Sequence, residues 1–278
     1  MNLFDKTVQA ALKNNKDYSP LITVVEKEIM HHDILREMNK AGFLKNLTFI
    51  GGTCLRLCYG SERLSEDLDF TGGFDFRKKD LSGIGDILQE TFRKKYDFKL
   101  DIMEPVKETG NTETWKIKII TRPKQPDLPA QRINIDISIL PSYERKPAML
   151  KNYYGIEQGT SGLILFAESL NEIFVDKIIA FALRPNRVKN RDLWDIFWLS
   201  RKNIELSKHL LDKKLNDRKI AYKIFSVKYA ERLEEIKNGQ SGFIKEMRRF
   251  LAPSAFDEGF TNHLWWQYLL GLLEDFKL

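Results

Sequence analysis

Residues 47–70 constrain the fold of this 278-residue chain more than any other segment. A short apolar run over residues 47–50 leads directly into Gly51, Gly52 and Thr53. Two glycines at the end of a strand let backbone N–H groups approach a ligand closely, and the threonine adds a hydroxyl donor where a helix begins. The pattern predicts a strand, a turn that cradles phosphate, and a short helix over residues 54–60.

Two acidic residues follow this turn at a spacing typical of a strand. Asp67 and Asp69 alternate with Leu68 and Phe70, so both carboxylates should point to one face of a sheet. Like charges held this close repel each other, and a cation between them removes the repulsion. Mg²⁺ takes one or two carboxylates together with substrate phosphates. The glycine turn and the acidic strand together therefore predict metal-assisted nucleotidyl transfer.

A third carboxylate is expected on a later strand over residues 133–139. There Asn134, Asp136 and Ser138 alternate with isoleucines, so one face of the strand is polar and the other apolar. If this strand pairs beside the one that carries Asp67 and Asp69, Asp136 would complete a three-carboxylate metal site. The alternative is that Asp136 is an ordinary solvent-facing strand residue.

The hydrophobic pattern changes along the chain. A helix is expected to begin with Ser19 as N-cap and Pro20 at its first position. Beyond about residue 168 the strand patterns stop, and a capping box of Ser169 and Glu172 opens a series of helices. We therefore expect an α/β (α+β) fold, with an α/β domain over residues 1–160 and a helical domain over residues 161–278.

The composition excludes several classes of protein. No stretch approaches the roughly 20 uncharged apolar residues that a membrane span needs, and the first residues have no apolar core of a signal peptide. Cys54 and Cys58 are too few for a zinc site and are expected to be reduced core residues. These observations predict a cytoplasmic protein without a membrane partner.

The positive charge is unevenly distributed. The net charge is +6, yet residues 177–219 hold twelve Lys and Arg against five Asp and Glu, so the rest of the chain is slightly negative. A local basic excess suits a polyanion such as a nucleoside triphosphate or RNA. The alternative is a solvated helical surface with scattered lysines, and charge alone does not decide between the two.

Four motifs in order resemble a known family. Residues 51–57 (GGTCLRL) and 63–70 (RLSEDLDF) look like the signature of the AbiEii/AbiGii toxin-type nucleotidyltransferases, within the DNA polymerase beta-like nucleotidyltransferase superfamily. Residues 172–184 and 189–196 resemble the family's lysine-containing helix and its R-D-x-x-D motif. The resemblance implies a polymerase beta-like core with a short mixed sheet, followed by a helical C-terminal region that contributes lysine and aspartate motifs to the site.

The resemblance also implies roles for the first group of residues. Gly51, Gly52 and Thr53 would hold the phosphates of an NTP. The metal, Mg²⁺ or alternatively Mn²⁺, would be bound by Asp67 and Asp69, with Asp136 as the third ligand. Just upstream, the side chains that could donate to phosphate or support the carboxylates are Arg63 and Ser65.

The second group lies on two expected helices. Lys177 and Arg184 are seven residues apart, hence on one helix face, and would reach the triphosphate as cationic clamps. Asp192 and Asp195 share a face of the next helix. One of them could orient Lys177 or act as a base on the incoming hydroxyl, and the sequence does not say which.

The expected function is an Mg²⁺-dependent nucleotidyltransferase that moves an NMP from an NTP to a hydroxyl acceptor and releases pyrophosphate. The resemblance points to RNA, at the 3′ end of tRNA, as acceptor, and to a toxin silenced by a separately encoded antitoxin protein. One alternative is a small acceptor such as an antibiotic, which the basic C-terminal half disfavours for a cationic drug. Others are a nucleotide- or RNA-binding protein without catalysis, and an ATP-dependent kinase of the same fold.

Overall fold

The computed structural model describes residues 2–106, 110–123, 129–256 and 258–276. The chain forms two compact units, Met1–Glu168 and Ser169–Leu278. The boundary lies later than the expected division at residues 160 and 161, because the last strand of the sheet runs from Ile164 to Glu168. Of the expected connection over residues 121–131, residues 124–128 lie outside the described residues.

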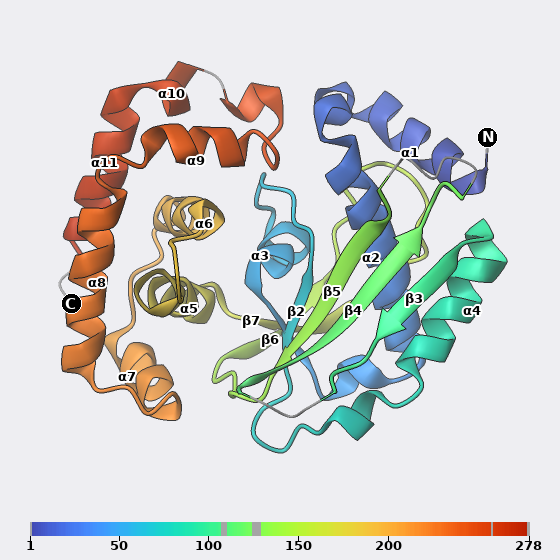
Figure 1. Cartoon of the computed structure of the whole chain (residues 1–278), viewed down its shortest axis with the longest axis horizontal. Coiled ribbons are helices and arrows are strands. Elements are labelled where there is room, and N and C mark those ends of the chain that lie inside the picture. The colour runs from blue at the N-terminus through green and yellow to red at the C-terminus, as the bar shows by residue number, and fades with distance from the viewer. Residues whose placement is uncertain (1, 107–109, 124–128, 257, 277–278) are drawn as a thin grey trace. The chain divides into compact units, whose positions relative to one another are not determined.

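A seven-stranded mixed sheet forms the centre of the first unit (Figure 1). The strand order is β3-β4-β5-β2-β1-β7-β6. The pairs β1–β7 and β2–β5 are parallel, and the other neighbours are antiparallel. The mixed α/β fold expected from the sequence is confirmed. The strands are β1 (Thr48–Ile50), β2 (Leu68–Thr71), β3 (Lys99–Met103), β4 (Thr112–Ile120), β5 (Gln131–Ser138), β6 (Arg145–Met149) and β7 (Ile164–Glu168).

Helices cover one face of this sheet. In Figure 1, α2 and α4 lie behind β3, β4 and β5, and α2 packs on β5 while α4 packs on β3. The isoleucines Ile133, Ile135 and Ile137 of β5 are fully buried, as the alternation predicts. Polar residues that alternate with them therefore occupy the opposite face. The helices of the first unit are α1 (Leu3–Asn14), α2 (Ile22–Lys40), α3 (Gly51–Cys54) and α4 (Ile84–Tyr96).

The start of α2 differs from the expected one. Ser19 and Pro20 lie inside a 3₁₀ helix over Lys16–Leu21, and the α-helix begins only at Ile22. The hydroxyl of Ser19 donates to the carbonyl of Lys16 at 2.7 Å and caps no helix. The expected N-cap is therefore wrong, because the fixed φ of proline suits the first turn of a 3₁₀ helix as well as that of an α-helix.

The second unit is built from helices around α5. Ser169 caps α5, because its Oγ accepts from the backbone N–H of Glu172 at 3.1 Å, and the helix ends just before Arg184 and Pro185. α5 packs against α6, α7 and α8. The helices are α5 (Leu170–Leu183), α6 (Asn190–Ser200), α7 (Lys208–Asp217), α8 (Tyr222–Ile236), α9 (Gln240–Met247), α10 (Glu258–Thr261) and α11 (His263–Glu274).

Over the described ranges, no helix combines the length and the apolar character that crossing a membrane requires. Cys54 and Cys58 are both free thiols and both buried, in agreement with the expectation that they are reduced core residues. Burial raises the pKa of the Cys54 thiol well above its usual value, so the side chain is neutral at physiological pH.

Two adjacent histidines on α2 are buried in the first unit. His31 shares a hydrogen bond of 3.0 Å with the carbonyl of Glu66, and His32 one of 2.7 Å with the hydroxyl of Thr160. Burial lowers the pKa of His31 to about 4, although the carboxylate of Glu28 opposes the shift. Burial also lowers the pKa of His32 to about 3. Both imidazoles are therefore neutral in the folded protein at neutral pH.

These histidines make folding sensitive to mild acid. The unfolded chain protonates both below about pH 6.5, whereas the folded chain does so only near pH 4 and pH 3. The stability they contribute is thus complete above pH 6.5 and is lost as the pH falls. We expect the free energy of unfolding to drop by roughly 2 kcal/mol per histidine between pH 7 and pH 5, measured by urea denaturation.

Replacing both histidines separates their contribution to the pH dependence of stability from general acid denaturation. The double variant His31→Gln/His32→Gln should lose less stability between pH 7 and pH 5 than the wild type. His209→Gln, at an exposed position, should behave like the wild type. Equal losses in all three proteins would contradict the assignment.

Candidate functional site

Strand register brings two acidic residues to neighbouring positions in the first unit. β2 and β5 run parallel, and Asp69 lies directly opposite Asp136, so the pairing on which the role of Asp136 depended is present. Asp67 immediately precedes β2, and its Oδ1 accepts from the backbone N–H of Asn134 at 3.0 Å. The hydroxyl of Thr114, on β4, donates to Oδ1 of Asp136 at 2.6 Å. These bonds fix the orientation of half-buried carboxylates on one face of the sheet.

The turn after β1 packs tightly against this acidic strand. Ile50, the last residue of β1, lies opposite Asp69, so Gly51 comes next to that carboxylate. A Cβ on Gly51 would stand 2.6 Å from Oδ2 of Asp69, and the backbone φ of Gly51 is +76°. Both the close approach and the left-handed backbone therefore require glycine here.

The second glycine lies against a buried cation. A Cβ on Gly52 would stand 2.2 Å from Nη2 of Arg63 and 3.2 Å from Oγ of Ser65. Arg63 is buried, and its Nη1 donates to the carbonyl of Leu64 at 2.9 Å. Of the two roles expected for Arg63 and Ser65, this placement beside the turn favours support of the site.

The hydroxyl of Thr53 has a structural partner. It donates to the backbone carbonyl of Asp67 and is buried. The bond ties α3 to the residue that precedes β2, so the glycine turn and the acidic strand hold each other in place. The structure thus brings together the first group of expected site residues: Gly51, Gly52, Thr53, Arg63, Ser65, Asp67, Asp69 and Asp136.

A buried ion pair, which the sequence analysis missed, holds the loop between the glycine turn and β2. Nε of Arg56 lies 3.3 Å from Oε2 of Glu28, and both side chains are buried. Glu28 accepts from the backbone N–H of Ser65 at 3.1 Å, and Arg56 donates to the carbonyl of Ser61 at 3.1 Å. The sequence signal for this pair is Glu28 itself, an acidic residue three positions after Val25 on the apolar face of a helix.

The second unit contains a network of two cations and two carboxylates. Nζ of Lys177 lies 2.9 Å from Oδ1 of Asp192 and 2.7 Å from Oδ2 of Asp195. Nη2 of Arg184 lies 2.7 Å from Oδ2 of Asp192. α5 positions the cations and α6 the acids. The second group of expected site residues is therefore brought together, and both aspartates contact Lys177.

The network holds Asp192 in its charged form. Burial alone would raise the pKa of Asp192, but the charges of Lys177 and Arg184 outweigh it and lower the pKa well below the usual range. Asp192 also lies in the first turn of α6, where the helix dipole favours negative charge. An anion held between two cations is poorly suited to take up a proton.

The same unit contains a second lysine with matching surroundings. Nζ of Lys214 lies 2.9 Å from Oε1 of Glu172 and 2.7 Å from Oδ2 of Asp176. Arg218 contacts Asp176 at 3.3 Å. Lys214 joins α7 to α5, carries no expected role in the reaction, and so provides a natural control for Lys177.

The described part of the chain holds no group of three or more His, Cys, Asp or Glu side chains that could bind a metal ion. Asp67, Asp69 and Asp136 therefore do not form the expected three-carboxylate metal site by themselves. Their oxygen donors are the kind that Mg²⁺ and Mn²⁺ prefer, and they suit a metal only where the phosphates of a substrate supply the rest of the ligand set.

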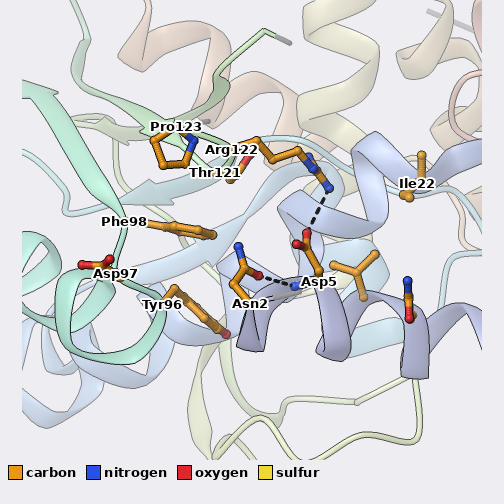
Figure 2. Close-up of a pocket in the computed structure, with 11 residues that line it drawn as sticks. Asn2, Asp5, Ile22, Tyr96, Asp97, Phe98, Thr121, Arg122 and Pro123 are labelled. Atoms are coloured by element: carbon orange, nitrogen blue, oxygen red, sulfur yellow. Dashed lines mark hydrogen bonds and ion pairs between the residues drawn. The ribbon is translucent and has the colours of Figure 1, made fainter. Parts of the chain in front are cut away.

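A separate pocket of about 610 Å³ lies at the other end of the sheet in the first unit. Figure 2 shows Arg122 reaching toward Asp5, at 3.4 Å, and Asn2 capping the start of α1. Arg122 also contacts Glu26. The cation is thus already neutralised by two acids, and none of the expected site residues lines this pocket.

The family follows from comparison with family models. Residues 33–262 match the model described as "Nucleotidyl transferase AbiEii toxin, Type IV TA system". The chain belongs to this family. It is accordingly a nucleotidyltransferase toxin of a type IV toxin–antitoxin system, and such enzymes generally use an NTP and a divalent metal. No curated protein sequence matches the chain.

A solved structure, MenT4, shares the fold, and two others show weaker similarity. MenT4, a nucleotidyltransferase toxin from Mycobacterium tuberculosis H37Rv, superimposes with a TM-score of 0.59 at 12% identity, covering 99% of this chain and 90% of that one. A proposed nucleotidyltransferase from H. pylori gives a TM-score of 0.48 at 19% identity, covering 88% of this chain and 92% of its own. JHP933 from Helicobacter pylori gives 0.43 at 17%, covering 90% and 87%.

The contact between Gly51 and Asp69 predicts the effect of adding one methyl group. Gly51→Ala should reduce nucleotidyl transfer, because the new Cβ displaces the carboxylate of Asp69. It should also lose roughly 1–2 kcal/mol of stability through its left-handed backbone. Gly73→Ala is the matched control, since Gly73 has φ +75° and nothing within 4 Å of an added Cβ. Similar losses of activity in the two variants, measured beside urea denaturation, would contradict this view.

Proposed function

We propose that this toxin is an Mg²⁺-dependent nucleotidyltransferase that moves an NMP from an NTP to a hydroxyl of RNA, at the 3′ end of tRNA, and releases pyrophosphate. The observation that carries the proposal is the register that sets Asp69 opposite Asp136, with Gly51 packed against Asp69. We place its action in the cytoplasm, with a separately encoded antitoxin protein as its partner.

In this proposal Asp67, Asp69 and Asp136 are the metal-binding carboxylates, with Mn²⁺ as an alternative metal. When bound, the metal polarises the α-phosphate and neutralises charge on the departing pyrophosphate. The backbone N–H groups at Gly51 and Gly52 provide donors for the triphosphate. Glycine has no side chain to block the close approach of a phosphate. Arg63, Ser65 and Thr53 keep the turn and the carboxylates in place, in accord with their packing.

The cations of the second unit supply the remaining charge in this proposal. Lys177 and Arg184 attract the triphosphate, and Asp192 and Asp195 orient Lys177. The contacts favour orientation over general base catalysis, because both carboxylates are buried and lie within 3 Å of the ammonium group. The helical domain thereby contributes lysine and aspartate motifs to the reaction.

The choice of acceptor rests on charge. The excess of Lys and Arg over residues 177–219 favours a polyanion over a cationic antibiotic. Part of that excess is balanced internally, since Lys214 and Arg218 contact acids of the same unit. Transfer to a small hydroxyl acceptor is therefore kept as the second candidate, to be separated by experiment.

Removing one metal-binding carboxylate tests the chemistry. The purified protein is incubated with Mg²⁺, total tRNA and each α-³²P-labelled NTP in turn. We expect label on RNA from the wild type, and at least about 100-fold less from Asp69→Asn, because a metal ligand supplies several kcal/mol to such reactions. Asp86→Asn, at an exposed helix position, should retain full transfer.

Other outcomes of this experiment exclude the proposal. Unlabelled RNA, with pyrophosphate released only when small hydroxyl acceptors are present, would assign the enzyme to small acceptors. Full labelling by Asp69→Asn would remove that residue from the metal site.

The two buried lysines test the role of the second unit. Lys177→Gln and Lys214→Gln should each destabilise the protein, because each leaves two carboxylates without their shared cation. Only Lys177→Gln should also lower kcat for nucleotidyl transfer, by about 10-fold or more beyond any effect of Lys214→Gln. Transfer assays below the unfolding transition, beside urea denaturation, measure both effects. Equal rates for the two variants would rule out a specific role for Lys177.

A further inference from the structure

Three exposed cations lie on the same sheet face as the acidic residues of the first unit. On β4, Lys116 and Lys118 continue the alternation that begins at Thr114, the hydrogen-bond donor to Asp136. On β5, Arg132 lies four residues before Asp136. The register sets Thr114 opposite Asp136 and Lys118 opposite Arg132. The cations therefore extend this face outward from the acidic residues.

This face is the one that the helices of the first unit leave open. Trp115, Ile117 and Ile119 alternate with the cations of β4 and are buried, on the side where α2 and α4 pack. Figure 1 shows those two helices behind β3, β4 and β5. Lys116, Lys118 and Arg132 are exposed. Their ammonium and guanidinium groups are thus presented to solvent.

The three cations differ from the basic groups described above. Arg56, Lys177 and Lys214 each contact an acid. Among described residues, by contrast, no ion pair involves Lys116, Lys118 or Arg132. Lys118 lies opposite Arg132 on one side and opposite Asp101 of β3 on the other, so the like-charge pair, which costs roughly 0.2–1 kcal/mol, is offset in part by one acid. A polyanion bound across the strands would remove that cost.

We propose that Lys116, Lys118 and Arg132, here called the basic strand face, bind the phosphodiester backbone of the RNA acceptor and lead its end to the carboxylates. The inference rests on the proposed function and names the surface that holds its acceptor. Arg132 and Asp136 are separated by about 13 Å along an extended strand. Cations at that distance reach backbone phosphates beyond the reacting end.

The chemistry of the face favours RNA over an acidic protein surface. Asn134 lies between Arg132 and Asp136, opposite Lys116, and Thr114 lies opposite Asp136; such amide and hydroxyl groups are typical phosphate contacts. Most apolar side chains of β4 and β5 point to the buried side, whereas Ile120 and, on the edge strand β3, Met103 lie on the exposed face beside the cations.

The test is the salt dependence of RNA binding. Binding of fluorescently labelled total tRNA to the full-length protein is measured by anisotropy from 50 to 200 mM KCl. The variant Lys116→Gln/Lys118→Gln/Arg132→Gln should bind roughly tenfold or more weakly at the low-salt end. Its slope of log K against log salt should fall by about 2, because three phosphate contacts are lost. In transfer assays the KM for tRNA should rise, with kcat at saturating tRNA unchanged.

A matched control carries the same charge change elsewhere. Lys6, Lys13 and Lys16 are exposed cations on α1 and the adjoining 3₁₀ helix. Lys6→Gln/Lys13→Gln/Lys16→Gln should keep the affinity and slope of the wild type. Equal weakening in the two triple variants would mean that net charge alone is measured, and would overturn the proposal.

Two further outcomes also overturn it. One is an unchanged tRNA affinity and slope in the strand-face variant; Asp69-dependent transfer would then leave the proposed function standing without this surface. The other is an equal loss of binding to polyglutamate, which would assign the face to an acidic protein partner. If neither the wild type nor Asp69→Asn transfers label to RNA, by contrast, the proposed function itself is excluded.

Discussion

The ion pair between Glu28 and Arg56 is the interaction on which the geometry of the first unit depends. Two buried charges carry a large desolvation cost, which is offset only when further hydrogen bonds satisfy both groups. Here a backbone N–H and a backbone carbonyl of one loop, at Ser65 and Ser61, provide those bonds. Burial alone would lower the pKa of Arg56, yet Glu28 and neighbouring tyrosines raise it, so the guanidinium stays charged. The loop is thereby fixed to α2 at both ends.

From that loop the position of the acidic strand follows. Arg63 and Ser65 pack under Gly52, and the carbonyl of Asp67 accepts from Thr53, so the turn and the strand share one support. The sheet then sets Asp69 beside Asp136 by parallel pairing. Like charges at neighbouring positions oppose folding, and so do Lys118 and Arg132 across β4 and β5. Both pairs of like charges, Asp69 with Asp136 and Lys118 with Arg132, lie on one face of the sheet.

Much of this arrangement was predictable because it follows from short-range periodicity. The alternation around Asp67 and Asp69, and again around Asp136, fixes which side chains share a face whatever the rest of the chain does. Lys177 lies on α5, whereas Arg184 follows the last residue of α5 with an extended backbone, so helical spacing does not explain why both contact Asp192. The mixed sheet and the helical second unit agree with expectation.

The failures have physical causes of their own. β6 carries Arg145, Lys146 and Pro147, and this charged, proline-containing composition does not predict a strand. Pro147 is tolerated because β6 is an edge strand. β7 (Ile164–Glu168) was not expected as a strand, and it pairs with β1 at the end of the first unit. The residues that contact Glu28 lie 28 to 126 positions away in sequence. Contacts between such distant residues cannot be predicted from a local sequence pattern.

In the proposed reaction, the network around Lys177 has a consequence for turnover. Because Asp192 and Asp195 both contact the ammonium group, a phosphate that approaches it competes with two carboxylates. Binding through this lysine is then an exchange of one anion for another, so the net gain is small. The same exchange runs in reverse after reaction, when the carboxylates compete with pyrophosphate for the cation. A lysine held in this way gives up tight binding of the substrate in return for ready release of the product.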